Sequence, residues 1–308
     1  MKKIFKRPAL VLTALILAAG LAGCKNASGS EPEFEIEDGV LKKYRGESAE
    51  VIIPDGVTKI KEFAFYHNWY IKNATIPEGV TEIGGLAFGE CANLESVVIP
   101  STVTIIDDGA FSDCNRLEAI EIPAGVTRIC NSTFLRCYAL KNVTIPDSVI
   151  TIDNYAFEGC SLTNSANIKI PDGVTSIGVR AFCDTGITDV EVPGSVEDLS
   201  GFQESKLQTV HIKEGVKRIN EYAFSYCKKL ETITIPSTIE RIAYNVFEGC
   251  TALSSVNYNG TREKWKNLYN FESYSSKDIE HVTVSCMDGY IKYKKGEVYE
   301  ESDSTASE

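Results

Sequence analysis

The sequence predicts a repeat solenoid made mainly of short β-strands, with turns and short helical segments between them, and two observations carry this prediction. An apolar alternation that ends at a proline returns every 20 to 25 residues. Phenylalanine recurs nine times in one register, at positions 65, 88, 111, 134, 157, 182, 202, 224 and 247. A unit of this length cannot close a core alone, so stacked units are expected to bury one shared apolar ridge.

Residues 1–23 have the features of an export signal. A basic start is followed by an apolar run that is too short to span a bilayer comfortably. The run ends in Leu21-Ala22-Gly23-Cys24, which resembles the lipobox of bacterial lipoproteins, and that resemblance implies acylation of Cys24 and a membrane anchor. If Cys24 is acylated, residues 24–33 form a short lipidated, flexible tether. The alternative is an ordinary cleaved signal with an unrelated cysteine.

The charge of the chain argues against polyanionic partners. The net charge is −12, and removal of residues 1–23, which hold four basic and no acidic groups, gives −12 − 4 = −16. Such a chain repels phosphate backbones and anionic lipid. We therefore expect no nucleic-acid partner, and we expect the lipid on Cys24 to make the membrane attachment.

Caps are predicted at both ends of the repeats, because a solenoid leaves open sheet edges. Residues 34–48 read as a hairpin with a tight turn at Asp38-Gly39. Residues 260–299 read as a short helix that begins after Thr261 and buries Trp265, followed by a second hairpin with a turn at Asp288-Gly289. The end of the chain, 300–308, reads as an acidic disordered tail.

The repeats themselves occupy residues 49–259, in about nine to ten coils. In "AFSDCNRLEAIEIP", residues 110–123, Ile120 and Ile122 alternate with Glu121, which predicts a half-buried strand. Proline then ends the strand because it lacks an amide hydrogen. The residues in this place are Pro54, Pro77, Pro100, Pro123, Pro146, Pro171, Pro193, Lys213 and Pro236, with Asn259 closing the series.

The pattern "AFxxCxxLxxIxIPxxVxxI" resembles the leucine-rich repeats of BspA-type bacterial surface proteins. The resemblance covers about residues 49–259. It implies a right-handed leucine-rich-repeat solenoid with a parallel sheet of short strands, and a broad association with bacterial cell surfaces and attachment. It implies no enzymatic activity.

Cysteine recurs three residues after the spine phenylalanine, and we interpret it as a structural ladder. A cysteine there behaves as a small apolar residue with a weak donor. Spacing of 23 residues does not suit a metal site, and parallel side chains disfavour disulfides between coils, so we expect free, buried thiols and neither metal nor cofactor. The ladder consists of Cys91, Cys114, Cys137, Cys160, Cys227 and Cys250; the states of Cys130, Cys183 and Cys286 stay open.

Two departures from the repeat are candidate binding surfaces. The first unit has "FYHNWY", which places Tyr66, His67, Trp69 and Tyr70 in a loop, where they serve either recognition or packing under the first hairpin. The rhythm also breaks over 160–213, which marks either a binding surface or tolerated drift. Acidic pairs such as Asp107-Asp108 read as solvated turn residues.

These observations favour a membrane-anchored, extracytoplasmic binding or adhesion module for protein or polysaccharide. A structural envelope role without a diffusible ligand is the alternative. A glycan hydrolase would need two carboxylates placed across a cleft, which a solenoid sheet does not predict, so we expect no enzyme.

Overall fold

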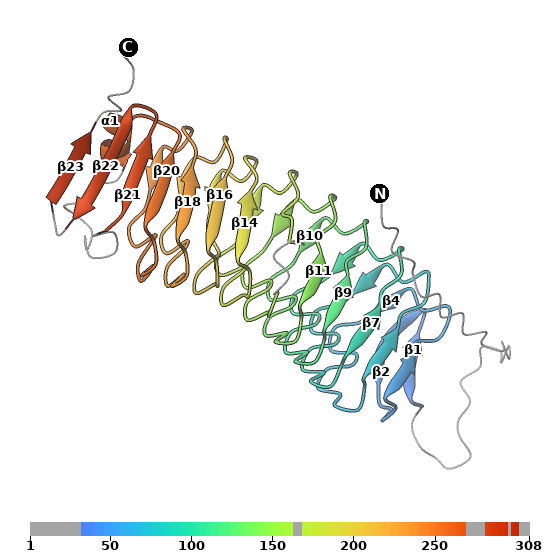
Figure 1. The fold of residues 1–308 in the computed structure, drawn as a ribbon. Helices are drawn as coiled ribbons and strands as arrows, with labels where there is room; N and C mark the ends of the chain where they lie inside the picture. Colours follow the sequence, from blue (N-terminus) through green and yellow to red (C-terminus); the bar gives the residue numbers. More distant parts are fainter. Residues whose placement is uncertain (1–31, 163–167, 269–280, 295–296, 302–308) are drawn as a thin grey trace, which may run out of the picture. The chain divides into compact units, whose positions relative to one another are not determined.

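Two series of parallel strands alternate along the chain in the computed structural model (Figure 1). The structure describes residues 32–162, 168–268, 281–294 and 297–301. The chain divides into two units, Met1–Glu33 and Phe34–Glu308, and nearly all described residues belong to the second. The predicted signal peptide, Cys24 and the tether up to residue 31 lie outside the described residues.

The first series contains strands before every repeat proline except Pro171, and also before Lys213 and Asn259. The strand expected before Pro171 is absent: residues 168–170, which follow the two inserted residues, form none. Neighbouring strands pair in parallel, as in Val51 with Ala74 and Val190 with Val210. Side chains alternate between buried and solvent-facing, so one face of each strand joins the core. The strands are β3 (Glu50–Ile52), β5 (Asn73–Thr75), β7 (Ser96–Val98), β9 (Ala119–Glu121), β11 (Asn142–Thr144), β14 (Asp189–Val192), β16 (Thr209–Ile212), β18 (Thr232–Ile235) and β20 (Ser255–Tyr258).

The second series was not predicted. Each of its strands has only two residues, which is too short for an alternation to be visible in the sequence, yet the second residue is always buried. These strands stack in parallel from coil to coil. They are β4 (Lys59–Ile60), β6 (Glu82–Ile83), β8 (Ile105–Ile106), β10 (Arg128–Ile129), β12 (Thr151–Ile152), β13 (Ser176–Ile177), β15 (Asp198–Leu199), β17 (Arg218–Ile219) and β19 (Arg241–Ile242).

The nine spine phenylalanines form one column in the core, as their register predicts. Each is at most 2% exposed. Successive rings lie 4.5 to 6.2 Å apart between centroids, with planes only 6° to 15° from parallel. Ring stacking adds to the stabilisation that comes from removing these side chains from water.

The turn that carries each phenylalanine uses an unusual backbone. The residue two positions after each spine phenylalanine has a positive φ, for example 57° at Glu90, and so in most coils has the residue two positions before it, for example 52° at Leu86. The amides of Leu86, Phe88 and Glu90 all donate to carbonyls of the next coil, at 2.8 to 2.9 Å. Because coil-to-coil hydrogen bonds fix this geometry, residues other than glycine occupy most of these left-handed positions.

The N-terminal cap is the predicted hairpin. Strands β1 (Phe34–Glu37) and β2 (Val40–Tyr44) are antiparallel, and the turn residues Asp38 and Gly39 have φ values of 49° and 75°. The hairpin continues the second series, because β2 pairs with β4.

Helix α1 (Arg262–Leu268) opens the C-terminal cap, with the Thr261 hydroxyl accepting a hydrogen bond from the Lys264 amide at 3.3 Å. Trp265 in this helix is 1% exposed.

The C-terminal strands continue the first series instead. They are β21 (Thr283–Cys286), β22 (Gly289–Lys294) and β23 (Glu297–Glu301). The third strand was not expected: its last two residues belong to the predicted acidic tail, and residues 302–308 lie outside the described part of the chain. Within the described ranges, no helix is long and apolar enough to cross a membrane.

Candidate ligand-binding surface

The aromatic loop of the first coil places two large rings in solvent. Trp69 is 57% exposed and Tyr70 is 52% exposed, whereas the spine residue Phe65 just before them is fully buried. His67 is also exposed, and its ring lies 4.7 Å from the Trp69 ring between centroids. Tyr66 is partly buried. The loop therefore presents a group of neighbouring rings rather than a single side chain.

A glutamate of the next coil holds this loop. The Tyr66 hydroxyl donates to Glu90 at 2.5 Å, and His67 Nδ1 lies 2.7 Å from the other carboxylate oxygen. These hydrogen bonds, first from Tyr66 and then from His67, lower the pKa of Glu90, and the bond to Glu90 raises the pKa of Tyr66. Glu90 therefore stays ionised and fixes both rings.

Asn68 shapes the turn between the rings. It occupies the position that cysteine holds in most later coils. Its Oδ1 accepts the amides of Tyr70 and Ile71 at 3.0 and 3.2 Å, and its Nδ2 donates to the Gly46 carbonyl at 3.0 Å. The loop is thus tied to the residues that follow the N-terminal hairpin.

A hollow of about 300 Å³ lies between this loop and residues 44–47. Each of the two interpretations of this loop, packing and recognition, therefore fits some of its residues. Tyr66 and Asn68 are held by neighbouring segments, and Trp69 and Tyr70 stay open to solvent. The charged neighbours Arg45 and Glu47 line the same hollow and were missed in the sequence, because only the fold brings them beside residues 66–70.

The ladder cysteines are buried and free. Each described thiol of the ladder is at most 2% exposed and none forms a disulfide. The thiols donate to the carbonyl of the spine phenylalanine in the preceding coil, at 3.0 to 3.2 Å. Burial raises the pKa of Cys91 to about 12 and that of Cys227 to about 11. Thiols of this kind are poor nucleophiles at neutral pH.

The three cysteines outside the ladder that the structure describes are free as well. Cys183 is buried, and Cys130 and Cys286 are partly exposed. Cys130 lies with Asp107 and Asp108 in a group whose ligand atoms are within 4.8 Å of one another. Both carboxylates already accept hydrogen bonds from backbone amides: Asp107 accepts the Asp108 amide at 2.8 Å, and Asp108 accepts the Asn131 amide at 3.0 Å. This group therefore has an evident structural role at a turn.

The irregular region is built around one glycine. Gly201 has φ of 102°, and a Cβ at this position would lie 2.6 Å from the Gly178 carbonyl oxygen. The Phe182 amide donates to the Gly201 carbonyl at 2.7 Å, so the shortened coil keeps its place in the turn ladder. Leu199 and Phe202 remain in the continuous buried core, although residues are missing between them.

The chain matches a family of known proteins. The matching model is described as the BspA type leucine rich repeat region, and it matches in six copies over residues 35–164 and 161–277. No match was found among the curated proteins.

Three solved structures illustrate the similarity of fold. One is a leucine rich cell surface protein from Faecalibacterium prausnitzii A2-165, at 24% identity over 78% of this chain and 98% of that chain, with a TM-score of 0.43. The leucine rich repeat protein of T. pallidum has 22% identity over 70% of this chain and 82% of that chain, with a TM-score of 0.40. The pneumococcal vaccine antigen PcpA has 20% identity over 72% of this chain and 75% of that chain, with a TM-score of 0.49. At these values the likenesses carry no argument about function.

The family match covers more than half of the chain and agrees with the coil architecture. Its two matched ranges include all nine spine phenylalanines and both series of strands. The chain therefore belongs to the family of BspA-type leucine-rich repeat proteins.

Proposed function

We propose that the chain is a membrane-anchored, extracytoplasmic lipoprotein that acts as a protein- or glycan-binding adhesion module. Membership of the BspA-type family supports a binding role, since repeat solenoids use extended surfaces for recognition. The observation that carries the proposal is the pair of exposed rings, Trp69 and Tyr70, at the edge of a hollow. No enzymatic activity is proposed.

The hollow has the mixed chemistry of a recognition site. Aromatic faces pack against apolar faces of sugars or side chains, and exposed Trp and Tyr are enriched at binding hot spots. Arg45 and Glu47 supply charged hydrogen-bonding groups beside the rings. Because Glu90 already fixes Tyr66 and His67, a ligand would meet a preorganised surface and less side-chain entropy would be lost on binding.

The test is a screen of the full chain against arrays of glycans and extracellular-matrix proteins. The triple variant Tyr66→Ala/Trp69→Ala/Tyr70→Ala is run beside the wild type. We expect a ligand whose affinity falls about tenfold or more in the variant, as expected for lost hot-spot residues. The matched control Tyr138→Ala/Tyr155→Ala/Tyr222→Ala removes three other exposed rings and should keep the affinity.

The outcomes separate the two functions. A ligand that binds wild type and both variants equally would remove the aromatic loop from the proposal. No ligand at all, together with co-purification with peptidoglycan, would favour the alternative of a structural envelope protein without a diffusible ligand.

Membrane attachment is tested separately. The proposal rests on the sequence Leu21-Ala22-Gly23-Cys24. Cells that express the chain should incorporate a palmitate analogue into it. A Cys24→Ala chain that still takes up the label would contradict lipid attachment at this residue.

A further inference from the structure

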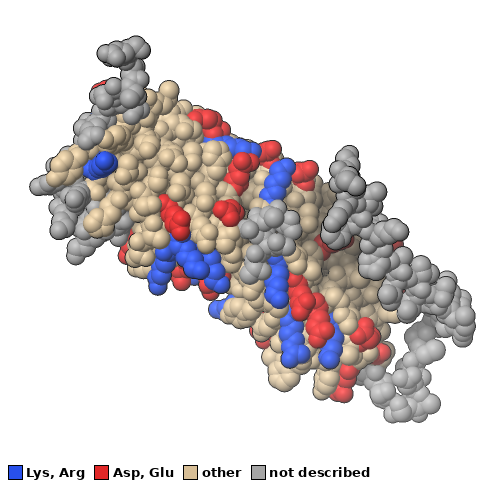
Figure 2. All heavy atoms as spheres, in the orientation of Figure 1, with Lys and Arg blue, Asp and Glu red and all other residues tan. Residues whose placement is uncertain are grey.

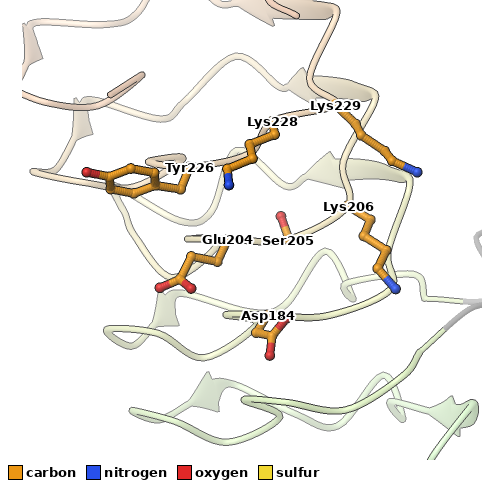
Figure 3. Close-up of a pocket in the computed structure, with 7 residues that line it drawn as sticks. All are labelled: Asp184, Glu204, Ser205, Lys206, Tyr226, Lys228 and Lys229. Carbon is orange, nitrogen blue, oxygen red and sulfur yellow. The ribbon is translucent and has the colours of Figure 1, made fainter. Parts of the chain in front are cut away.

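A second hollow lies on the outer turns of three successive coils, far along the sequence from the aromatic loop. Its volume is about 280 Å³ (Figure 3). It begins at Asp184, continues over Glu204 and Lys206, and ends at Tyr226, Lys228 and Lys229. Figure 3 shows the lysines coming from two successive coils, with Tyr226 and Glu204 toward one side of the hollow and Lys206 and Lys229 toward the other.

The hollow results from a change in loop length. The spine phenylalanine and the next buried leucine or isoleucine are five positions apart in 182–187 and 202–207, and six apart in 224–230. The two short turns leave a step in the surface, and the longer turn that follows supplies Lys228 and Lys229 at its edge. The irregular rhythm of the sequence therefore has a defined consequence on the surface of the solenoid.

The hollow is cationic although the chain is acidic. The chain has a net charge of −12, yet the lining holds three lysines against two carboxylates. Within the described residues, no ion pair involves Lys206, Lys228 or Lys229, whereas Arg128 and Arg218 pair with aspartates. Figure 2 shows Lys and Arg side chains gathered along the turns below β16 and β18.

The remaining groups add acceptors and a ring. Glu204 lies 3.4 Å from the guanidinium of Arg180, which offsets part of its charge, and Asp184 is exposed. Tyr226 is 45% exposed, and its hydroxyl donates to Glu248 at 2.9 Å, which fixes the ring at the rim. The hollow therefore combines cationic donors, carboxylate acceptors and one aromatic face.

We propose that this hollow binds an acidic saccharide. The lysines would contact a carboxylate or sulfate of the glycan, the carboxylates of Asp184 and Glu204 would accept its hydroxyls, and Tyr226 would pack against a sugar face. An acidic peptide fits less well, because its closely spaced charges would approach Asp184 and Glu204 without hydroxyls to offer. This site does not depend on the aromatic loop, and either can fail alone.

The experiment is a titration of the full chain with four probes: a galacturonate oligomer, a sulfated dextran fragment, unsulfated dextran and a polyglutamate peptide. We expect binding of at least one anionic saccharide probe, weakening with added NaCl because the contacts are exposed, and no binding of dextran. The variant Lys206→Gln/Lys228→Gln/Lys229→Gln should bind the anionic probe with an affinity lower by about tenfold or more. Binding of only the carboxylated or only the sulfated probe identifies the anionic group.

A matched variant keeps the test specific. Lys72→Gln/Lys141→Gln/Lys169→Gln makes the same change in net charge at three exposed lysines elsewhere on the solenoid, and should bind like the wild type. The aromatic-loop variant should bind like the wild type as well. Equal binding by both lysine variants, equal binding of dextran, or equally tight binding of a polyglutamate peptide that requires the same three lysines would overturn the proposal.

Discussion

The coils of Phe88 to Phe157 and the coils of Phe182 and Phe202 share one core but differ at the interior position three residues after the spine phenylalanine. The first group has cysteine there, and the second has Thr185 and Ser205. Each thiol donates to the phenylalanine carbonyl of the preceding coil, whereas each hydroxyl donates at 2.8 Å to the phenylalanine carbonyl of its own coil. Cysteine thus joins two coils, and the hydroxyl residue closes one turn.

Reach and bond length explain the difference. A carbon–sulfur bond is longer than a carbon–oxygen bond, and a thiol donates a longer hydrogen bond than a hydroxyl does, so Cys137 reaches the Phe111 carbonyl at 3.1 Å. Loop length does not decide the choice, because Cys160 lies in a short turn and still bonds to the Phe134 carbonyl. The side chain itself therefore selects the partner.

The largest expected effect is an alkaline loss of stability caused by the cysteine coils. Burial raises the pKa of Cys91 to about 12 and also raises the pKa of Cys114 and Cys160. Above about pH 9 the unfolded chain loses thiol protons while the folded chain keeps them, so the folded state is penalised as pH rises. Each such thiol lowers the free energy of unfolding by about 1.4 kcal/mol per pH unit.

Urea titrations at pH 7 to 10 measure this effect. The midpoint should stay constant up to pH 8 and then fall steeply. Thr185→Cys/Ser205→Cys adds two buried thiols and should steepen the fall, whereas Thr185→Val, which adds no titratable group, should not. A wild-type midpoint that is unchanged between pH 8 and pH 10 would contradict the role given to the thiols.

The next effect tests what the two regions share. Phe134 and Phe202 are both fully buried in the same ring column. Replacement of either by alanine should lower the free energy of unfolding by about 3 to 5 kcal/mol, because a large apolar side chain is lost and a cavity is left. Urea unfolding of both variants gives the comparison. A much smaller loss at Phe202 would mean that the shortened coils do not carry the same core.

The spine and the first strand series could be predicted because they depend on one residue type at one spacing. Phe65 to Phe247 recur in register, and the alternation around Ile120 and Ile122 spans enough residues to be visible. The turn hairpins were visible for a similar reason, since Asp38-Gly39 and Asp288-Gly289 are local signals. Local or strictly periodic patterns thus specify most of the fold.

The left-handed turn positions and the surface hollows could not be predicted. Residues as different as Leu86, Arg136 and Tyr155 have positive φ, because hydrogen bonds between coils fix the backbone there and the side chain does not. The nearness of Lys206 to Lys228 depends on a stacking step that follows two shortened turns. Such features arise from contacts between coils, which the sequence of one coil does not contain.

The smallest effect isolates the position at which the two regions differ. In Cys137→Ser the shorter hydroxyl should turn to the Phe134 carbonyl of its own coil, as Ser205 does with Phe202. The bond to the Phe111 carbonyl is then exchanged for one within the coil. The free energy of unfolding should fall by about 1 kcal/mol, because the link between coils is lost and a more polar group is buried. The reverse change, Ser205→Cys, should gain a bond to the Phe182 carbonyl and cost less. If both swaps prove equally costly in urea unfolding at pH 7, packing volume rather than the choice of carbonyl would distinguish the cysteine coils from the hydroxyl coils.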